Sequence, residues 1–503
     1  MNLTPTFEQF EADWAAGKNQ LVYTRLAADL DTPVSLMLKL ADAAKMSFML
    51  ESVTGGEVRG RYSVVGLKPD VIWDCHGTES RINRQARYDD AAFEPLDGNP
   101  LDTLRQLIAE SRIEMPEGLP AIAAGLFGYL GYDMIRLVEN LPDINPDPIG
   151  APDAMLMRPT VVAVLDGVKG EVTVCSPVWT ASGLSARAAY AQAAERVMDA
   201  VRDLERAPAG ESRSLGDSAH LGAYQSNFTP EAYCAAVDKA KEYIRAGDIF
   251  QVVPSQRWTA DFTLPPFALY RSLRRTNPSP FLTFFNFGAF HIVGASPEIL
   301  VRLRDGEVTV RPIAGTRPRG ATLEEDRAYE ADLLADEKEL AEHLMLLDLG
   351  RNDVGRVAKI GSVRPTEKFI IERYSHVMHI VSNVVGDLRA GEDALSALLA
   401  GLPAGTVSGA PKVRAMEIID ELEPEKRGIY GGGVGYFAAN GEMDMCIALR
   451  TAVVKDQKLY IQAGGGVVFD SDPQAEFEET VNKSKALRKA AEDAGLFVRR
   501  ANS

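Results

Sequence analysis

The sequence predicts an α+β fold in which β-sheets are covered by helices. Glycine-rich, strand-like segments at 290–298, 308–316 and 431–436 stand among helical segments, and the two kinds of element follow one another without a regular βα period. This irregular order argues against a Rossmann or TIM-barrel pattern, and we find no internal repeat. The helices of the C-terminal half are predicted at 322–334, 336–350, 392–401 and 411–421.

The chain is expected to divide into two intimately packed domains, because 503 residues are too many for one simple core. Between Arg206 and Ser218 the sequence becomes small and polar, as is typical of a linker. We therefore predict an N-terminal domain at 1–205, a linker at 206–224 and a C-terminal domain at 225–503.

Composition and charge indicate a cytoplasmic protein that binds neither nucleic acid nor a membrane. Apolar residues make up 46% of the chain and charged residues 25%, which is ordinary for a soluble globular protein. The formal net charge of −17 argues against a nucleic-acid or anionic-membrane surface. The four cysteines form no CxxC pair, the N-terminus has no signal pattern, and the longest mostly apolar run, 121–132, is too short to span a bilayer.

Local patterns place several further elements. In the C-terminal domain Thr229 and Pro230 supply an N-cap and a first helical residue, Gly247 ends that helix, and a strand at 249–253 follows. In the N-terminal domain the predicted elements are a helix at 33–41, strands at 47–52 and 61–66, and a tightly packed glycine-rich segment at 125–131.

The helix at 336–350 combines an apolar side with an acidic one. Asp336 can cap it, and Glu339 can reach back to the backbone N–H of the cap. At about 100° per residue the packed side is expected to hold Leu340, Leu344 and Leu347. The other side is expected to hold Glu339, Glu342 and His343. Taken alone, this acidic side is either a solvated surface or half of a site.

A second acidic helix begins at Asp472 and Pro473. On it Glu476, Glu479 and Lys483 share one stripe, which is either a solvated Glu–Lys ladder or the other half of a site. Two helices that each offer a pair of carboxylates, without cysteine nearby, suit a hard cation such as Mg²⁺.

Glycine runs and one arginine suggest an anion site close to these carboxylates. Residues 464–466 are three glycines that end a predicted strand just before the second acidic helix, where free N–H groups can hold an anion. Arg450 closes another strand and suits a carboxylate. Neither 405–412 nor 431–436 matches a nucleotide-binding motif. Spacing alone therefore predicts a Mg²⁺-dependent site for a small, carboxylate-bearing anion, without naming the reaction.

Six segments of the C-terminal domain follow one another as distinct motifs: PIAGTRPRG at 312–320, EHLM at 342–345, DLGRND at 348–353, YSHVMHIVS at 374–382, GTVSGAPK at 405–412 and YGGGVGY at 430–436. Together they resemble the motifs of the chorismate-utilising enzymes, and most closely those of the anthranilate synthase component I branch. Weaker similarity extends to 50–52 and 60–63 in the N-terminal domain. The resemblance implies a four-layer α/β/β/α fold, in which stacked β-sheets are sandwiched between helices.

The resemblance also implies residue roles. The matching Mg²⁺ carboxylates are Glu342 and Glu479, with Glu339 and Glu476 beside them. The residues that match the chorismate-holding positions are Gly315, Thr316, Tyr430, Arg450, Gly464, Gly465, Gly466 and, near the same carboxylates, Lys483.

The reaction implied by the resemblance adds ammonia at C2 of chorismate, expels the C4 hydroxyl and then eliminates pyruvate to give anthranilate, the first committed step of tryptophan biosynthesis. Glu298 matches the acid that protonates the leaving hydroxyl, and His379 matches a histidine near the reacting ring, with orientation or proton transfer as its role. Water-using relatives resemble one another in a lysine where this chain has Gln251. Aminodeoxychorismate synthases typically have a nucleophilic lysine where this chain has Ala314. Thr406 agrees with the branch that aminates directly.

Partners and regulation follow from the same resemblance. None of the four cysteines stands in a glutaminase setting, so a separate glutamine amidotransferase subunit is expected to supply ammonia, in a heterotetramer of two large and two small subunits. Feedback inhibition by tryptophan is also implied. The residues matching the inhibitor site are Glu51, Ser52, Arg61, Pro280, Phe281 and Leu282. Phe281-Leu282 replaces the Tyr-Met that the family often has, which changes the contacts offered to the inhibitor.

Two alternatives stay open at this point. The first is aminodeoxychorismate synthase component I, which belongs to the same family but makes a different product. The second is a catalytically silent, amino-acid-binding regulatory subunit. The presence of Glu342, Glu479, Glu298 and Arg450 argues against a silent subunit.

Overall fold

The computed structural model describes residues 2–41, 44–51, 61–206, 221–374 and 377–498. It confirms the α+β class: strands and helices are mixed along the chain, and all pairings between described strands are antiparallel. The α-helices are α1 (Phe7–Ala15), α2 (Pro33–Ala41), α3 (Pro100–Glu110), α4 (Ala186–Glu205), α5 (Pro230–Ala246), α6 (Pro266–Thr276), α7 (Leu323–Ala335), α8 (Glu337–Val357), α9 (Ala394–Gly401), α10 (Lys412–Leu422) and α11 (Pro473–Asp493).

The strands of the N-terminal part are β1 (Gln20–Ala27), β2 (Ser47–Glu51), β3 (Tyr62–His76), β4 (Glu79–Asn83), β5 (Glu94–Leu96), β6 (Gly125–Leu130), β7 (Ala154–Asp166) and β8 (Glu171–Val178). Those of the C-terminal part are β9 (Gln225–Ser226), β10 (Gln251–Val252), β11 (Ser255–Asp261), β12 (Phe281–Asn286), β13 (Phe290–Ser296), β14 (Ile299–Arg304), β15 (Glu307–Val310), β16 (Ile313–Pro318), β17 (Arg364–Arg373), β18 (Val377–Asp387), β19 (Gly409–Ala410), β20 (Gly433–Ala438), β21 (Met443–Ile447), β22 (Thr451–Lys455) and β23 (Lys458–Gly464).

The two halves of the chain share hydrogen-bonded strands. β2 pairs with β12, in a register that places Glu51 opposite Leu282, and β6 pairs with β20 along its whole length. The division at 205 and 225 therefore stays a prediction about sequence organisation, while the strands themselves join both parts into continuous sheets. Most of the predicted linker, 207–220, lies outside the described residues.

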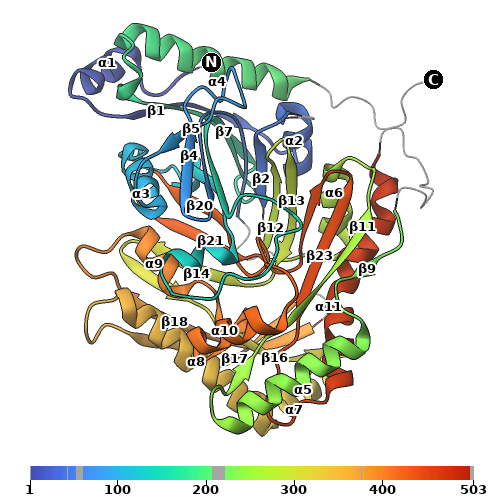
Figure 1. Ribbon diagram of the computed structural model, residues 1–503. Helices are drawn as coiled ribbons and strands as arrows, with labels where there is room; N and C mark the ends of the chain where they lie inside the picture. Colours follow the sequence, from blue (N-terminus) through green and yellow to red (C-terminus); the bar gives the residue numbers. More distant parts are fainter. Residues whose placement is uncertain (1, 42–43, 52–60, 207–220, 375–376, 499–503) are drawn as a thin grey trace.

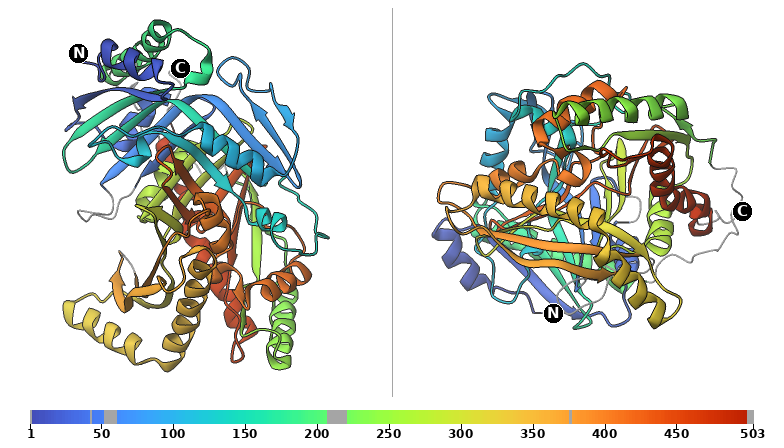
Figure 2. Two further views of the ribbon diagram at one scale, coloured as in Figure 1. Left: turned by 90° about the vertical axis from the view of Figure 1, so that its left-hand side faces the viewer. Right: turned by 90° about the horizontal axis from the view of Figure 1, so that it is seen from below.

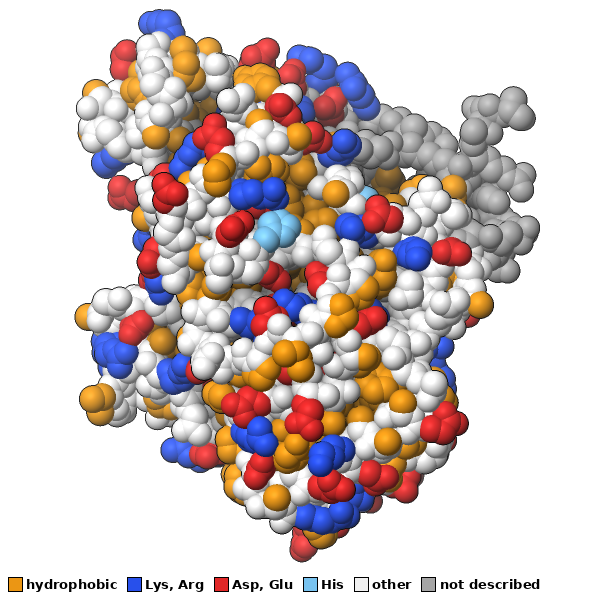
Figure 3. Space-filling view, viewed as in Figure 1, with side chains coloured by type: hydrophobic (Ala, Val, Ile, Leu, Met, Phe, Trp, Pro, Cys, Tyr) orange, Lys and Arg blue, Asp and Glu red, His pale blue; other side chains and the backbone are white. Residues whose placement is uncertain are grey.

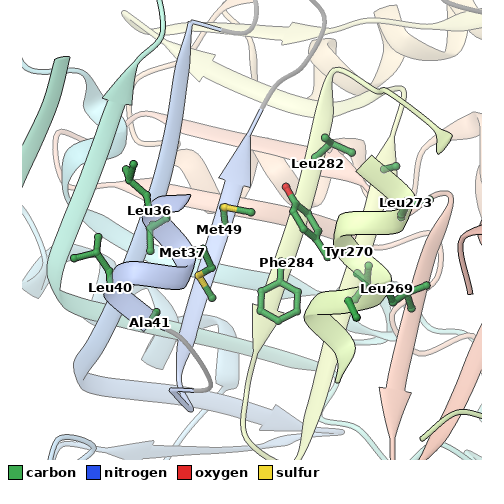
Figure 4. Packing of buried hydrophobic residues seen from close by; sticks show 14 of the residues in the cluster. Leu36, Met37, Leu40, Ala41, Met49, Leu269, Tyr270, Leu273, Leu282 and Phe284 are labelled. Carbon is green, nitrogen blue, oxygen red and sulfur yellow. The ribbon is translucent and has the colours of Figure 1, made fainter. Parts of the chain in front are cut away.

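Helices cover the outer faces of the sheets, and a core made by strands and connections lies between them. The buried cluster that contains Phe48, Phe127 and Phe285 draws on β2, β6 and β12, and none of its described members is α-helical. A second cluster joins strands to α2, α4, α6 and α11, and a third joins strands to α3, α8 and α9. Figure 4 shows α2 and α6 packed beside β2 and β12, and Figure 2 shows α1 and α4 together on one outer side.

The surface and helix composition agree with the charge pattern of the sequence. Acidic and basic side chains are interspersed over the face drawn in Figure 3. Within the described ranges, no helix is both long and apolar enough to cross a membrane.

Caps explain where several helices begin. The Thr229 hydroxyl accepts a hydrogen bond from the Ala232 N–H, Pro230 occupies the first turn, and Gly247 ends α5 with a left-handed φ of 84°, as predicted. Only Gln251 and Val252 pair in the segment where a strand at 249–253 is predicted.

Helix α8 departs from its prediction in three ways. It continues beyond 350 to Val357, because its last turns have their own buried face. Asp336 caps it, but the backbone N–H of Asp336 contacts the Leu333 carbonyl instead of the Glu339 side chain. The expected packing of Leu344 is wrong, since that side chain is 55% exposed, and His343 is fully buried against Ser382 and Phe369. Leu347 is buried and Leu340 is half-buried, as predicted, so only the Leu344 and His343 positions are exchanged.

Replacing Phe48 with alanine is expected to lower the free energy of unfolding by about 3–5 kcal/mol, the usual cost of removing a fully buried phenylalanine. Its ring stacks on Phe127 at 4.3 Å and on Phe285 at 5.4 Å. Thermal and denaturant unfolding measure the loss. Tyr88, which is 87% exposed, provides the aromatic control, since Tyr88→Ala is expected to change stability little. Equal effects of the two substitutions would contradict this account of the inter-sheet core.

Candidate active site

A segment of three glycines is the point at which the predicted site residues meet. It follows β23 in the lower half of Figure 1, near α8, α10 and α11. A Cβ atom at Gly466 would lie 2.6 Å from Gln251 Nε2 and 3.7 Å from Glu342 Oε1. A Cβ atom at Gly465 would lie 3.1 Å from Glu476 Oε2. Only glycine lets the backbone approach these side chains so closely.

The α8 carboxylates face this segment. Gln251 Nε2 donates a 2.9 Å hydrogen bond to Glu342 Oε1. Glu339 Oε2 would lie 3.2 Å from a Cβ at Gly315, and its Oε1 lies 3.6 Å from the Arg317 guanidinium. Burial raises the pKa of Glu339, and the nearby charge of Glu342 raises it further.

The α11 carboxylates approach the glycines from another direction. Ser471 donates a 2.7 Å hydrogen bond to Glu476 Oε1, while Glu476 Oε2 is buried without a hydrogen-bond partner among the described residues. Burial raises the pKa of Glu476, and the charge of Glu479 adds to that effect. Lys483 lies 2.7 Å from Glu479 and donates to the Gly464 carbonyl at 3.0 Å. Part of the predicted ladder therefore exists, but its lysine also holds the end of β23.

These carboxylates fit a hard divalent cation. A buried oxygen of Glu476 lacks a partner, and two acidic side chains are held beside like charges, an arrangement that a cation would stabilise. Among the described residues, no group of three or more His, Cys, Asp or Glu is arranged to hold a metal. A Mg²⁺ ion that takes one or two carboxylates, and leaves its other positions to water or ligand oxygens, would not require such a group.

Glu298 is a buried acid at the junction of β13 and β14. Its side chain is almost inaccessible, and Thr406 Oγ1 donates to its Oε1 at 3.3 Å. Burial raises the pKa of Glu298 to about 8, against the smaller lowering effects of Thr406, the Ile313 backbone and Arg450. Around neutral pH this carboxyl group therefore carries a proton.

His379 lies on β18 beside the Gly315 turn. Its Nδ1 is 3.1 Å from the Gly315 carbonyl oxygen and 3.0 Å from Thr316 Oγ1. A carbonyl oxygen only accepts, so Nδ1 carries the hydrogen and Nε2 is left as an acceptor. Burial lowers the pKa of His379, which keeps the imidazole neutral. Gly315 has a φ of +72°, a conformation that glycine adopts without strain.

Arg450 and Tyr430 are the two remaining residues predicted to hold an anion. Arg450 follows β21 in a left-handed conformation with φ 47°. Burial lowers its pKa, with Glu298 and Tyr374 as opposing charges. The Tyr430 hydroxyl would lie 3.1 Å from a Cβ at Gly464 and takes a hydrogen bond from the Gly464 backbone. The predicted row of free N–H groups is incomplete, because Gly465 N–H donates to the Pro254 carbonyl.

A model of the family described as "chorismate binding enzyme" matches residues 68–489. A curated anthranilate synthase component 1 of Cereibacter sphaeroides is 80% identical over 498 residues, covering 99% of each chain. The chain belongs to the chorismate-binding enzyme family, in its anthranilate synthase component 1 branch. A Pseudomonas putida anthranilate synthase component 1 is 52% identical, over 96% of this chain and 97% of that one.

Solved structures agree in fold. The anthranilate synthase component I of Streptococcus pneumoniae TIGR4 is 37% identical, with a TM-score of 0.75 over 92% of this chain and 98% of that one. The menaquinone-specific isochorismate synthase MenF of Escherichia coli is 19% identical, with a TM-score of 0.70 over 97% and 99%, and supports the fold alone. These neighbours confirm the predicted class of this chorismate-binding enzyme.

A cavity of about 790 Å³ contains residues predicted for the inhibitor site, and Pro297 and Ile299, the two neighbours of Glu298, also line it. Glu51, Arg61, Pro280, Phe281 and Leu282 all line it, whereas Ser52 lies outside the described residues. The structure therefore gathers the predicted set from β2, β12 and the start of β3.

The sequence did not reveal what holds Glu51 in that cavity. Tyr270 and Arg274 of α6 both donate to its Oε1 at 2.5 Å, and its Oε2 is buried without a partner among the described residues. Their spacing of four residues places both on one face of α6, which is the only local signal that they act together. Arg61 makes a bidentate ion pair with Asp166, so its charge is already compensated.

Replacing Glu298 with glutamine is expected to change how the stability of this enzyme depends on pH. In the wild type the folded-state pKa of about 8 lies above the ordinary value of 4.5, so the protonated form stabilises the fold. That contribution is complete below about pH 4.5 and is lost as pH rises toward 8, by several kcal/mol, at about 1.4 kcal/mol per pH unit. Denaturant unfolding at pH 5 and pH 9 measures it. Glu298→Gln is expected to reduce the difference, of which part remains because Glu339 and Glu476 also have raised pKa values. An unchanged difference would place the titration elsewhere.

Proposed function

We propose that this enzyme converts chorismate and ammonia to anthranilate and pyruvate in a Mg²⁺-dependent reaction that tryptophan inhibits. The observation that carries the proposal is the buried Glu298 next to Thr406, whose pKa is raised by burial, in a site that also offers paired carboxylates and Arg450. Loss of the C4 hydroxyl needs a proton donor, because hydroxide is a poor leaving group.

Substrate binding rests on complementary charges. Arg450, a buried guanidinium near Glu298, would bind a carboxylate of chorismate as a bidentate donor. Glu342 and Glu479 would hold Mg²⁺, with Glu339 and Glu476 beside them, and the bound ion would offset the charge of the ring carboxylate.

Glu298 then supplies the proton to the departing oxygen. Its pKa of about 8 leaves it protonated at neutral pH, and Thr406 fixes one of its oxygens. Activity is therefore expected to fall as pH rises through the pKa of Glu298.

Two side chains support ammonia as the nucleophile. The Gln251 amide, in place of a lysine base, donates to Glu342 and has no free basic nitrogen. Ala314, in place of a lysine nucleophile, cannot form a covalent bond to the ring. Ammonia is already a nucleophile and needs neither group.

His379 is assigned to the second step, in which pyruvate leaves and the ring becomes aromatic. With Nδ1 committed to Gly315 and Thr316, its neutral Nε2 is the nitrogen that orients the ring or accepts a proton.

A separate glutamine amidotransferase subunit is proposed to deliver the ammonia. Burial raises the pKa of Cys75, Cys175 and Cys446 to about 12, and it also raises the pKa of Cys234, so none of these thiols is an activated nucleophile. The name component 1 given to its relatives also fits a partner component. We expect a cytoplasmic heterotetramer of two large and two small subunits.

The direct test incubates the purified chain with chorismate, ammonium and Mg²⁺ at about pH 8.5 and records product fluorescence. Fluorescent anthranilate is expected without an added lyase, and the signal should vanish when the metal is chelated. Glu479→Gln is expected to abolish turnover while leaving tryptophan binding intact, as measured by calorimetry. A non-fluorescent amino product would favour aminodeoxychorismate synthase, and no turnover at all would favour a silent regulatory subunit.

Tryptophan inhibition is expected to depend on Glu51 and its neighbours. Glu51→Gln removes the charge that faces the cavity and should raise the inhibitor concentration for half-inhibition at least tenfold, with uninhibited turnover unchanged. Ser52→Arg is expected to act in the same direction. Glu114→Gln changes an exposed glutamate that does not line the cavity, and it serves as the matched control. Inhibition curves that coincide for wild type and Glu51→Gln would remove Glu51 from the effector site.

A further inference from the structure

One arginine with no role assigned above lies at the junction of several site segments. Arg427 and Glu423 form an ion pair of 2.6 Å, and both side chains are almost completely buried. The Arg427 guanidinium also donates to the Val407 carbonyl at 2.5 Å and to the Val253 carbonyl at 2.6 Å. Such a charge is stable inside a protein only because its donors are satisfied.

The two backbone carbonyls that Arg427 contacts lie close in sequence to predicted site residues. Val407 directly follows Thr406, and Val253 stands two residues after Gln251. The centre of the guanidinium lies 5.5 Å from the Tyr430 ring, within the range of a cation–π interaction.

Glu423 extends the same junction to β11 and β23. Both the backbone N–H and the hydroxyl of Ser255 donate to its Oε1 at 2.8 Å. The Ser255 hydroxyl in turn accepts a 2.7 Å hydrogen bond from Gln462, two residues before Gly464. The ion pair therefore connects the segments that carry Thr406, Gln251, Tyr430 and Gly464, although it touches none of the reacting groups.

We propose that Arg427 is a positioning residue: it fixes the Thr406 loop, the Gln251 segment and Tyr430 against one another, and so sets the geometry around Glu298. The inference rests on the roles proposed for Glu298 and Thr406. A guanidinium suits this task because its planar fork serves several acceptors in fixed directions. A lysine has the same charge, but one ammonium group does not reach both carbonyls and the carboxylate together.

A change in the position of the Thr406 loop affects Glu298 through the hydrogen bond between Thr406 and Glu298. Thr406 is 3.3 Å from Glu298, so a small displacement of its loop breaks that hydrogen bond. The bond stabilises the charged carboxylate, and its loss raises the pKa of Glu298. A displaced loop therefore moves the alkaline limit of turnover to higher pH, which a general loss of stability does not do.

The test measures kcat, KM and the pH profile of Arg427→Lys, in the full-length chain with ammonium as nitrogen source. We expect kcat to fall about 100-fold, the scale of a misplacement near 1 Å, with a smaller change in the KM for chorismate. The alkaline limb of kcat is expected to move upward, as in Thr406→Val.

The matched control is Arg158→Lys. Arg158 also makes a buried, bidentate carboxylate pair, with Asp70 at 2.9 Å, and lies over the ring of Trp179, but it contacts no site segment. It is expected to lower the melting temperature while kcat and the pH profile stay at wild-type values. If Arg427→Lys behaves like this control, Arg427 is merely structural and the inference is overturned.

Glu423→Gln keeps the test decisive if Arg427→Lys does not fold. The amide has nearly the same shape and keeps one acceptor oxygen, but it removes the charge that attracts the Arg427 guanidinium. The same fall in kcat and the same upward shift of the alkaline limb are therefore expected. A variant with wild-type kcat and pH profile would overturn the inference. Should the wild-type chain itself make no anthranilate, the proposed function fails first, and the two failures are thereby distinguished.

Discussion

Repulsion between carboxylates is the constraint on which the site depends. Glu339 and Glu342 of α8 and Glu476 of α11 approach the Gly315 and Gly464–Gly466 segments, where burial and like charges raise the pKa of Glu339 and Glu476. Like charges repel one another more strongly as burial removes water from between them. The fold tolerates this because each helix is anchored by its own buried stripe. Because a cation would offset this repulsion, the site favours a bound cation and needs no complete, preformed set of protein ligands.

Two buried glutamates show how surroundings decide chemistry. Glu298 has a long hydrogen bond from Thr406 and a contact with the Ile313 backbone, but burial outweighs both and raises its pKa. Glu423 instead accepts hydrogen bonds from the Ser255 backbone N–H, the Ser255 hydroxyl and the Arg427 guanidinium. The first is equipped to give a proton away, and the second is equipped to hold its neighbours in place. The same side chain thus serves reactivity or rigidity according to the number of donors around it.

The sequence predicts the helices with explicit caps well, because capping and glycine termination act within a few residues. Thr229 and Gly247 bound α5 as expected. The sequence predicts the packed face of α8 less well, because an ideal rotation of 100° per residue does not say which face the neighbouring strands cover. For this reason Leu344 is exposed, whereas His343 is buried. The contacts of Glu51 with Tyr270 and Arg274, and of Glu423 with Ser255, join residues far apart in the chain, and no local pattern encodes such distances.

The pairing of β2 with β12 and of β6 with β20 has a consequence for biosynthesis. On the ribosome β2 and β6 are complete long before their partner strands exist, and translation at roughly 5–20 residues per second leaves a gap on the order of tens of seconds. During this time their hydrogen-bonding edges and the faces around Phe48 and Phe127 have no native cover, which makes the nascent chain prone to association. Two independently folding domains would complete their sheets without this delay.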